Sequence, residues 1–303
     1  MTTHNKIKNI TIISVSYRSG MHISRLFNNL NDKAQHKQNL KFIVIDNTNG
    51  EDQELNTILP KNLDLTIVRN DGRHYQRSIS HASGLDIGLM QSVTEYTLII
   101  DPDVHVFKSK WDSLCVDYLE DREKIVIGSP YPDWKLGKVH DYPSVVFMFF
   151  RTQEIKGLNK SFQPFPTLSK KIKNSILRKI TRLGIIASKS RLDKSQLLRK
   201  ITSILENIFG ITSPDTGNDI IKAIRIKDYE SINFKARLAH QLYSINASSF
   251  HYDMAREFEL YFYEDTPFMS HMYGSGVFHW KTANGSDVEY WQELIEHIER
   301  GAK

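Results

Sequence analysis

The sequence has almost no cysteine and no long apolar run. Cys115 is the single cysteine among 303 residues, so an internal disulfide and a zinc site built on several thiolates are excluded. We therefore expect a reducing, cytoplasmic setting. No apolar stretch reaches the roughly 18 residues that a membrane-spanning helix needs, and the opening MTTHNKIKN lacks the pattern of a signal peptide. Any membrane contact is therefore expected to be peripheral.

Two nucleotide-binding signatures are also missing. The turn after the first predicted strand reads SYRSGMH, without the G-x-G-x-x-G spacing of nicotinamide-dependent enzymes, and no G-x-x-x-x-G-K of Walker-type nucleotidases occurs. The composition is ordinary for a globular protein, with 40% hydrophobic and 25% charged residues and a net charge of +5. The basic excess suits polyanionic partners such as diphosphates, anionic lipid or nucleic acid.

The first 150 residues alternate between strand and helix patterns. This part of the chain predicts a helix at Ser78–Val93 and six strands, at Ile10–Tyr17, Lys41–Asp46, Leu65–Asn70, Tyr96–Asp101, Lys124–Ser129 and Ser144–Arg151. The alternation predicts an α/β, Rossmann-like fold with a mixed, mostly parallel sheet flanked by helices. Ligands of such sheets bind beyond the carboxyl ends of the strands, where Asp46, Asn70 and Asp101 stand.

The composition changes near residue 156. Lys and Arg crowd residues 170–200. Two basic amphipathic helices are expected there, with apolar stripes at Ile172, Ile176, Ile180 and Leu183 and at Leu197, Ile201, Ile204 and Ile208. These helices either lie on an anionic membrane surface or pack on the domain as a solvated hairpin. Further helices are expected at Asp219–Ile226 and Ser286–Glu299.

The triplet Asp101-Pro102-Asp103 directly follows the fourth predicted strand. Two carboxylates one residue apart can approach a single hard cation. Mg²⁺ and Mn²⁺ prefer such oxygen ligands and often share their coordination shell with substrate phosphates. The proline stiffens the turn. A plain acidic turn that ends a strand has the same letters, so the interpretation depends on the surrounding motifs.

The order of the surrounding motifs resembles the family 2 glycosyltransferases, which have the GT-A fold. The first strand ends in ISVSY and the second in VIDN; SGLDIG follows, and then IIDPDV. The resemblance implies donor-binding roles for Ser16, Tyr17, Asp46, Asp86, Asp101 and Asp103. Asp86 stands where the family usually has Asn, which departs from the pattern.

Weaker resemblances follow in the second half. The segment HMYGSG at 271–276 is similar to the late H-x-x-G-x-S segment of the family. It implies that His271 is a metal ligand beside Asp101 and Asp103, and that Ser275 contacts the donor. His105 is a further candidate ligand.

Asp215 precedes an apolar helical pattern, in the place where the family has its general base. A carboxylate there is also a plain helix cap, and Asp219 and Asp265 are the alternative bases. Trp111, Trp134 and Trp280 either stack on sugars or are buried.

The resemblance implies three parts: a donor-binding half at 1–155, a basic helical insertion at 156–210, and an acceptor or catalytic half with a C-terminal helix at 211–303. The implied reaction moves a sugar from a UDP- or GDP-type donor to a hydroxyl of a glycan or lipid-linked glycan, as in polysaccharide synthesis. It proceeds with inversion and with Mn²⁺ or Mg²⁺. No nucleic-acid partner is expected.

Two other interpretations stay open. One is a basic module that binds membrane or nucleic acid on a degenerate transferase fold, which the Lys and Arg run supports. The other is a haloacid-dehalogenase-like phosphatase, a class that also uses D-x-D after a strand. That class normally places the motif on its first strand, whereas here it follows the fourth.

Overall fold

The computed structural model describes residues 8–73, 75, 77–164, 189–245, 247–272, 281–282 and 285–301. The predicted stripe from Ile172 to Leu183, the donor contact Ser275 and the indole of Trp280 lie outside these ranges. Within them, no helix is long and apolar enough to span a membrane.

Seven of the described strands form one sheet, in the order β3-β2-β1-β4-β7-β6-β8. They are β1 (Ile10–Ser16), β2 (Leu40–Asp46), β3 (Leu65–Arg69), β4 (Tyr96–Ile100), β6 (Ile125–Gly128), β7 (Phe147–Arg151) and β8 (Glu230–Asn233). Neighbouring strands run parallel except β7, which is antiparallel to both β4 and β6. The predicted α/β fold with a mixed, mostly parallel sheet is confirmed.

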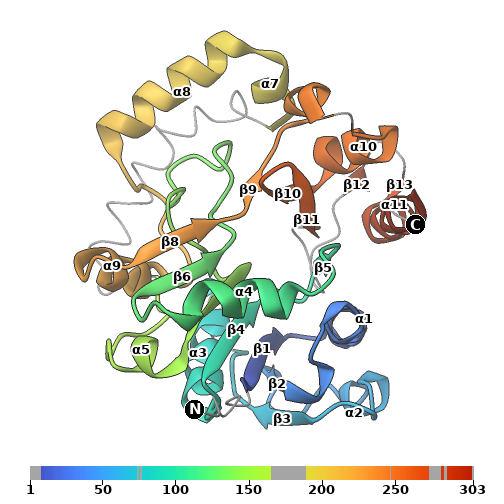
Figure 1. The fold of residues 1–303 in the computed structure, drawn as a ribbon, viewed down its shortest axis with the longest axis vertical. Helices are drawn as coiled ribbons and strands as arrows, with labels where there is room; N and C mark the ends of the chain where they lie inside the picture. Colours follow the sequence, from blue (N-terminus) through green and yellow to red (C-terminus); the bar gives the residue numbers. More distant parts are fainter. Residues whose placement is uncertain are drawn as a thin grey trace, which may run out of the picture.

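Helices cover both faces of this sheet (Figure 1). Because side chains alternate along a strand, Ile12 of β1 joins the apolar cluster under α1, α2 and α4, whereas Ile13 joins the cluster under α3, α5 and α9. The helices are α1 (Gly20–Lys33), α2 (Leu55–Ile58), α3 (Arg77–Gln91), α4 (Trp111–Glu120), α5 (Thr152–Lys156) and α9 (Asn218–Ile226). Burial on both faces explains why the central strands are apolar almost throughout.

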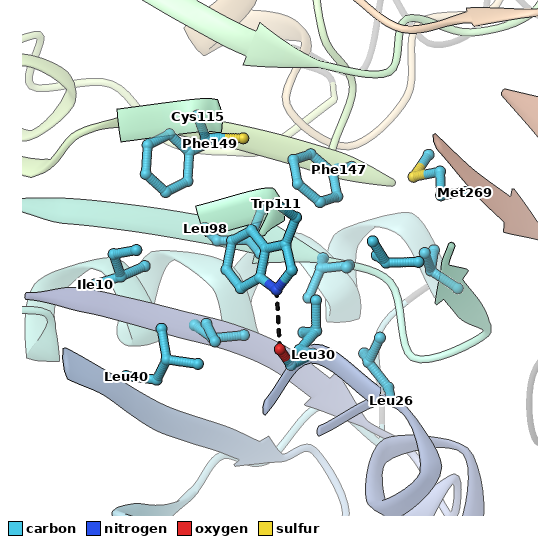
Figure 2. Close-up of a cluster of buried hydrophobic side chains, with 14 of the residues drawn as sticks. Ile10, Leu26, Leu30, Leu40, Leu98, Trp111, Cys115, Phe147, Phe149 and Met269 are labelled. Carbon is cyan, nitrogen blue, oxygen red and sulfur yellow. Dashed lines mark hydrogen bonds between the residues drawn. The ribbon is translucent and has the colours of Figure 1, made fainter. Parts of the chain in front are cut away.

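Figure 2 shows the cluster on the α1 and α4 side. The Trp111 side chain is fully buried there, and its indole N–H donates to the Leu30 carbonyl at 2.9 Å. Trp111 is therefore a core residue with a satisfied donor and does not stack on a sugar.

A second, four-stranded sheet has the order β5-β11-β10-β9. Its strands are β5 (Val104–Val106), β9 (Lys235–Ala236), β10 (Glu259–Tyr263) and β11 (Thr266–His271). Met269 of β11 reaches the main core, where Figure 2 places it beside Phe147. The two sheets therefore share one apolar core.

The remaining described elements lie outside these two sheets and the helices named above. They are the 3₁₀ helices η1 (Lys37–Asn39) and η3 (Ala239–Ile245), the helices α7 (Lys189–Lys194), α8 (Gln196–Phe209), α10 (Ser249–Glu257) and α11 (Asp287–Gly301), and the short strands β12 (Lys281–Thr282) and β13 (Gly285–Ser286). The helix expected at 286–299 is α11, and the second predicted basic helix is α8.

Candidate active site

A cavity of about 700 Å³ opens at the carboxyl ends of the parallel strands. Loops that follow β1, β2, β3 and β4 form one part of its wall. The first turns of α3, the loop between β6 and β7, and a few residues from the second half of the chain form the rest. The lining residues that matter for the chemistry are Tyr17, Asn47, Arg77, His81, Asp101, Asp103, Tyr131, Asp215 and His271. The ligand edge predicted for an α/β sheet therefore does carry a cavity.

Asp101, Asp103 and His271 meet at this cavity. The Nε2 atom of His271 lies 3.3 Å from Oδ1 of Asp103 and 3.8 Å from Oδ2 of Asp101. One ligand atom from each residue lies within 4.8 Å of the others, which is close enough to hold a metal ion. The pairing of β5 with β11 creates this proximity, because Val104 lies opposite His271 and the Met272 N–H donates to the Asp103 carbonyl at 3.0 Å.

The chemistry of this group suits a hard divalent cation. Its donors are two carboxylates and one imidazole, a set that Mn²⁺ and Mg²⁺ accept. Oδ1 of Asp101 is buried and has no hydrogen-bond partner in the described part of the chain. A buried polar atom without a partner is costly. Burial raises the pKa of the Asp101 carboxyl to about 6, although His81 and His271 act to lower it. A bound cation would supply a closer partner than His81, whose Nε2 lies 3.5 Å from this oxygen.

A buried ion pair stands behind His271. The Nδ1 atom of the ring lies 2.8 Å from Glu259, and Lys135 lies 2.5 Å from the other oxygen of that carboxylate. Burial would lower the pKa of His271, but the charges of Asp103 and Glu259 raise it to about 10. Burial would likewise raise the pKa of Glu259, but Lys135 and His271 lower it to about 2. Glu259 is therefore ionised, and it fixes which ring nitrogen faces the cavity.

Asp215 contributes a third carboxylate to the wall. Lys138 forms an ion pair with it, and the Thr216 N–H donates to it at 2.9 Å. Burial would raise its pKa, but Lys138 and these hydrogen bonds lower it. His81 lies 3.5 Å from Oδ1 of Asp101 and adds its own charge effect on Asp215. Asp215 is therefore a carboxylate that stays ionised near neutral pH.

The predicted donor residues divide into two groups. Tyr17 lines the cavity and is 39% exposed, whereas Ser16 and Asp46 are buried behind the wall. The Ser19 N–H donates to the Ser16 hydroxyl at 3.3 Å, and Asp46 accepts from the N–H and hydroxyl of Thr48 at 2.9 and 2.6 Å. Both residues shape the loops at the strand ends. Asn47, next to Asp46, lines the cavity in its place.

Asp86 is not among the residues that line the cavity. Its two carboxylate oxygens accept hydrogen bonds from the Ser161 hydroxyl at 2.5 Å and from the Phe162 N–H at 2.8 Å. The resemblance of the SGLDIG motif implies a position near the donor for Asp86. In the structure, Asp86 of α3 contacts the loop that follows α5. Its observed contacts fasten that loop to the helix.

His105 is also turned away from the candidate ligands. Its ring lies 3.0 Å from Glu299 of α11 and 3.3 Å from Arg25 of α1. These partners hold the ring against the helices. Burial lowers the pKa of His105 to about 4. Among the described residues, the group that could hold a metal ion consists of Asp101, Asp103 and His271 and does not include His105.

The alternative bases lie away from the cavity wall. Asp265 occupies the exposed turn between β10 and β11, is 77% exposed and pairs with Arg237 at 2.7 Å. Asp219 lies in the first turn of α9 and is absent from the residues that line the cavity. Of the three candidates, Asp215 is the one that lines the cavity with Asp101, Asp103 and His271.

Four polar residues at the site were missed by sequence reasoning. Arg77 and His81 had a usable signal, because they stand four residues apart at the start of a helix that follows a strand, and so share one face. Glu259 and Lys138 had none, because tertiary pairing alone brings them to the site.

No protein-family model matches the sequence, and no curated protein matches it. Among solved structures, the chain is similar to the mannosyltransferase PcManGT from Pyrobaculum calidifontis in complex with GDP-Man and Mn²⁺, at 15% identity and a TM-score of 0.42, over 72% of this chain and 68% of that one. It is also similar to TarS 1-349 from S. aureus, at 18% identity and a TM-score of 0.39, over 51% of this chain and 50% of that one.

A structure of TarS 1-349 in complex with UDP-GlcNAc gives the same identity and score, over 48% of its chain. The chain thus spans about half the length of the TarS structures that it matches. Likeness at this level assigns no function, so the assignment rests on the site.

Proposed function

We propose that the protein is a metal-dependent glycosyltransferase that uses a nucleotide-diphosphate sugar. One observation carries the proposal. Asp101, Asp103 and His271 converge at a cavity on the carboxyl edge of a mostly parallel sheet, where Oδ1 of Asp101 is buried and accepts no hydrogen bond from the described residues. An ion at this place would stand where a diphosphate can share its coordination shell. This arrangement supports the GT-A-like, family 2 interpretation of the motifs.

In this proposal Asp101, Asp103 and His271 hold Mn²⁺ or Mg²⁺. The ion supplies electrophilic stabilisation of the diphosphate leaving group. Glu259 accepts a hydrogen bond from Nδ1 of His271, which leaves Nε2 directed at the two aspartates. Arg77 and His81 line the same cavity, and the guanidinium of Arg77 adds positive charge to it. Side chains of this kind suit the negative charge of a nucleoside diphosphate.

Asp215 is the proposed general base. It is ionised, lines the cavity and lies near enough to Asp101 to affect its pKa. An acceptor hydroxyl bound beside it can give up its proton to the carboxylate as the oxygen attacks the anomeric carbon. A single displacement of this kind inverts the sugar. The tight pair with Lys138 lowers the basicity of Asp215, so transfer needs the acceptor oxygen to be well oriented.

The proposed partners are a UDP- or GDP-type donor and a glycan or lipid-linked acceptor. The proposed setting is cytoplasmic. Tyr17, Ser16, Asp46 and Ser275 remain the proposed contributors to the donor pocket.

A thermal-shift screen tests the proposal. UDP or GDP with Mn²⁺ is expected to raise the melting temperature of the wild type by several degrees, and Asp103→Ala is expected to abolish that rise. Asp265→Asn is the matched control, because Asp265 is 77% exposed and lies outside the cavity wall. No stabilisation by any nucleotide, or equal stabilisation of Asp103→Ala, would contradict the proposal.

A panel of nucleotide sugars then identifies the donor through its slow hydrolysis. Asp215→Asn is expected to keep nucleotide binding and to lose at least about a hundredfold in transfer rate, with Asp265→Asn again unchanged. Stabilisation by an oligonucleotide alone would favour the rival interpretation as a basic binding module.

A further inference from the structure

Helix α8 carries its apolar stripe on the outside of the molecule. Leu197, Ile201, Ile204 and Ile208 recur at helical spacing and are 70%, 41%, 57% and 67% exposed. A surface helix normally turns such a stripe toward the core. In Figure 1, α8 lies along the outer edge of the molecule, at the top of the view. The usual orientation of an amphipathic helix is therefore reversed.

The polar face of α8 attaches the helix to the rest of the protein. Thr202 is its buried residue, and the Glu206 carboxylate accepts from the Gly137 N–H at 2.5 Å and lies 3.1 Å from Nε2 of His140. Ser195 caps the start of the helix by accepting from the Leu198 N–H at 3.3 Å. Specific polar contacts fix the orientation, so the exposed stripe is a defined surface.

Charges are sorted in the same direction. The two acidic residues of α7 and α8 face the protein, with Glu206 beside His140 and Asp193 at 2.5 Å from His240. Lys200 stands beside the stripe on α8, and Arg191 and Lys194 are exposed on the adjoining helix α7. An apolar stripe bordered by cations, with its acids turned away, complements an anionic and partly apolar surface.

We propose that α8 and its cationic border form a docking surface for a bilayer that contains anionic lipid. The four apolar side chains enter the boundary between headgroups and acyl chains, and the Lys and Arg side chains face the lipid phosphates. Contact of this kind is peripheral, in agreement with the finding that no described helix can span a membrane. The proposal does not depend on the chemistry at the cavity, although it would hold the cavity near a membrane-bound acceptor.

Vesicle co-sedimentation of the full chain tests this surface. We expect the wild type to bind vesicles of phosphatidylcholine with phosphatidylglycerol at least about tenfold more tightly than vesicles of phosphatidylcholine alone, and to weaken as salt rises. Ile204→Asp with Ile208→Asp is expected to lose at least about tenfold of that binding. Met90→Asp is the matched control, because Met90 is 76% exposed on α3 and belongs to no stripe.

A second variant, Lys194→Gln with Lys200→Gln, changes exposed positions only and keeps the test valid if the double aspartate variant fails to fold. It is expected to lose the preference for anionic vesicles.

Inorganic phosphate, added at the same concentration as the lipid phosphate, should not displace the protein from vesicles, since the apolar stripe needs a bilayer. Equal binding of wild type and variants, or no binding by the wild type, would overturn the proposal. The wild type could instead form a dimer that the double variant Ile204→Asp with Ile208→Asp dissociates. That result would assign the stripe to a second copy of the chain and would also overturn the proposal. Nucleotide binding with Mn²⁺, measured on the same samples, reports separately on the proposed reaction.

Discussion

At the scale of single residues, the candidate site contains charges that neutralise one another in pairs. Asp103 lies beside His271, which lies beside Glu259, which lies beside Lys135. Unpaired charges in a buried place would cost several kcal/mol each. The chain of alternating charges therefore keeps each of these buried groups beside a partner of opposite charge. It also predicts that Glu259 matters although it lies behind the candidate ligands.

Glu259→Gln tests that prediction. The variant keeps a hydrogen-bond acceptor for Nδ1 of His271 but removes the charge that orients the ring. We expect its affinity for Mn²⁺ to fall by about 10- to 100-fold, as measured by the electron paramagnetic resonance of free Mn²⁺ during titration. Glu264→Gln, in the exposed hairpin turn, is the control. An unchanged Mn²⁺ affinity in Glu259→Gln would show that the pair is structural only.

Asp86→Asn tests whether Asp86 contributes to the donor pocket. Burial raises the pKa of the Asp86 carboxyl above its usual value, against hydrogen bonds from Ser161 and Phe162 that lower it. The protonated form is therefore the one that the fold favours, and its contribution to stability is lost as the pH rises through the raised pKa. At pH 7 we expect Asp86→Asn to be at least as stable as the wild type and to bind UDP or GDP within about twofold.

Urea unfolding at pH 4 and pH 7 measures the stability part, and calorimetric titration measures the binding part. A loss of nucleotide affinity of tenfold or more at unchanged stability would return Asp86 to the donor site.

At the scale of elements, close packing of α3 on β1 sets the position of Arg77 and His81. A Cβ added at Gly88 would lie 2.4 Å from Cγ2 of Ile13, and one added at Gly84 would lie 3.0 Å from the Val15 side chain. The absence of side chains at these positions lets the helix approach the strand. The glycines therefore have a packing role as well as their place in the SGLDIG motif.

Gly88→Ala is expected to destabilise the protein by about 1 to 3 kcal/mol, because β1 is buried on both faces and cannot easily move. Urea unfolding measures the change. Gly301→Ala is the control, since a Cβ there meets nothing within 4 Å, and a change within about 0.5 kcal/mol is expected. A neutral Gly88→Ala would mean that α3 adapts at little cost.

At the scale of the whole molecule, the sequence predicts the parts of the fold whose residues carry their own signal. The strands β1, β2 and β4 are buried almost throughout, so their residues are mostly apolar and β-branched. Strand β5 has three residues and exists through its pairing with β11, which no local pattern reveals. The same limit applies to the site. Asp101 and Asp103 stand at a strand end and were predictable, whereas Glu259 and Lys138 reach the site through tertiary contacts alone.

The basic helices show a related limit. The spacing of Ile201, Ile204 and Ile208 predicts an amphipathic helix, and α8 has that form. Periodicity does not indicate which face packs on the protein, since that depends on partners such as Gly137 and His140, which are distant in sequence.

The central claim is that a divalent cation held by Asp101, Asp103 and His271 binds the diphosphate of a nucleotide. A crystal grown with MnCl₂ and UDP or GDP, measured at the manganese absorption edge, tests it most directly. The account predicts an anomalous peak in contact with all three side chains and with the diphosphate oxygens. An ordered nucleotide in the cavity without such a peak, or a peak away from these residues, would contradict it.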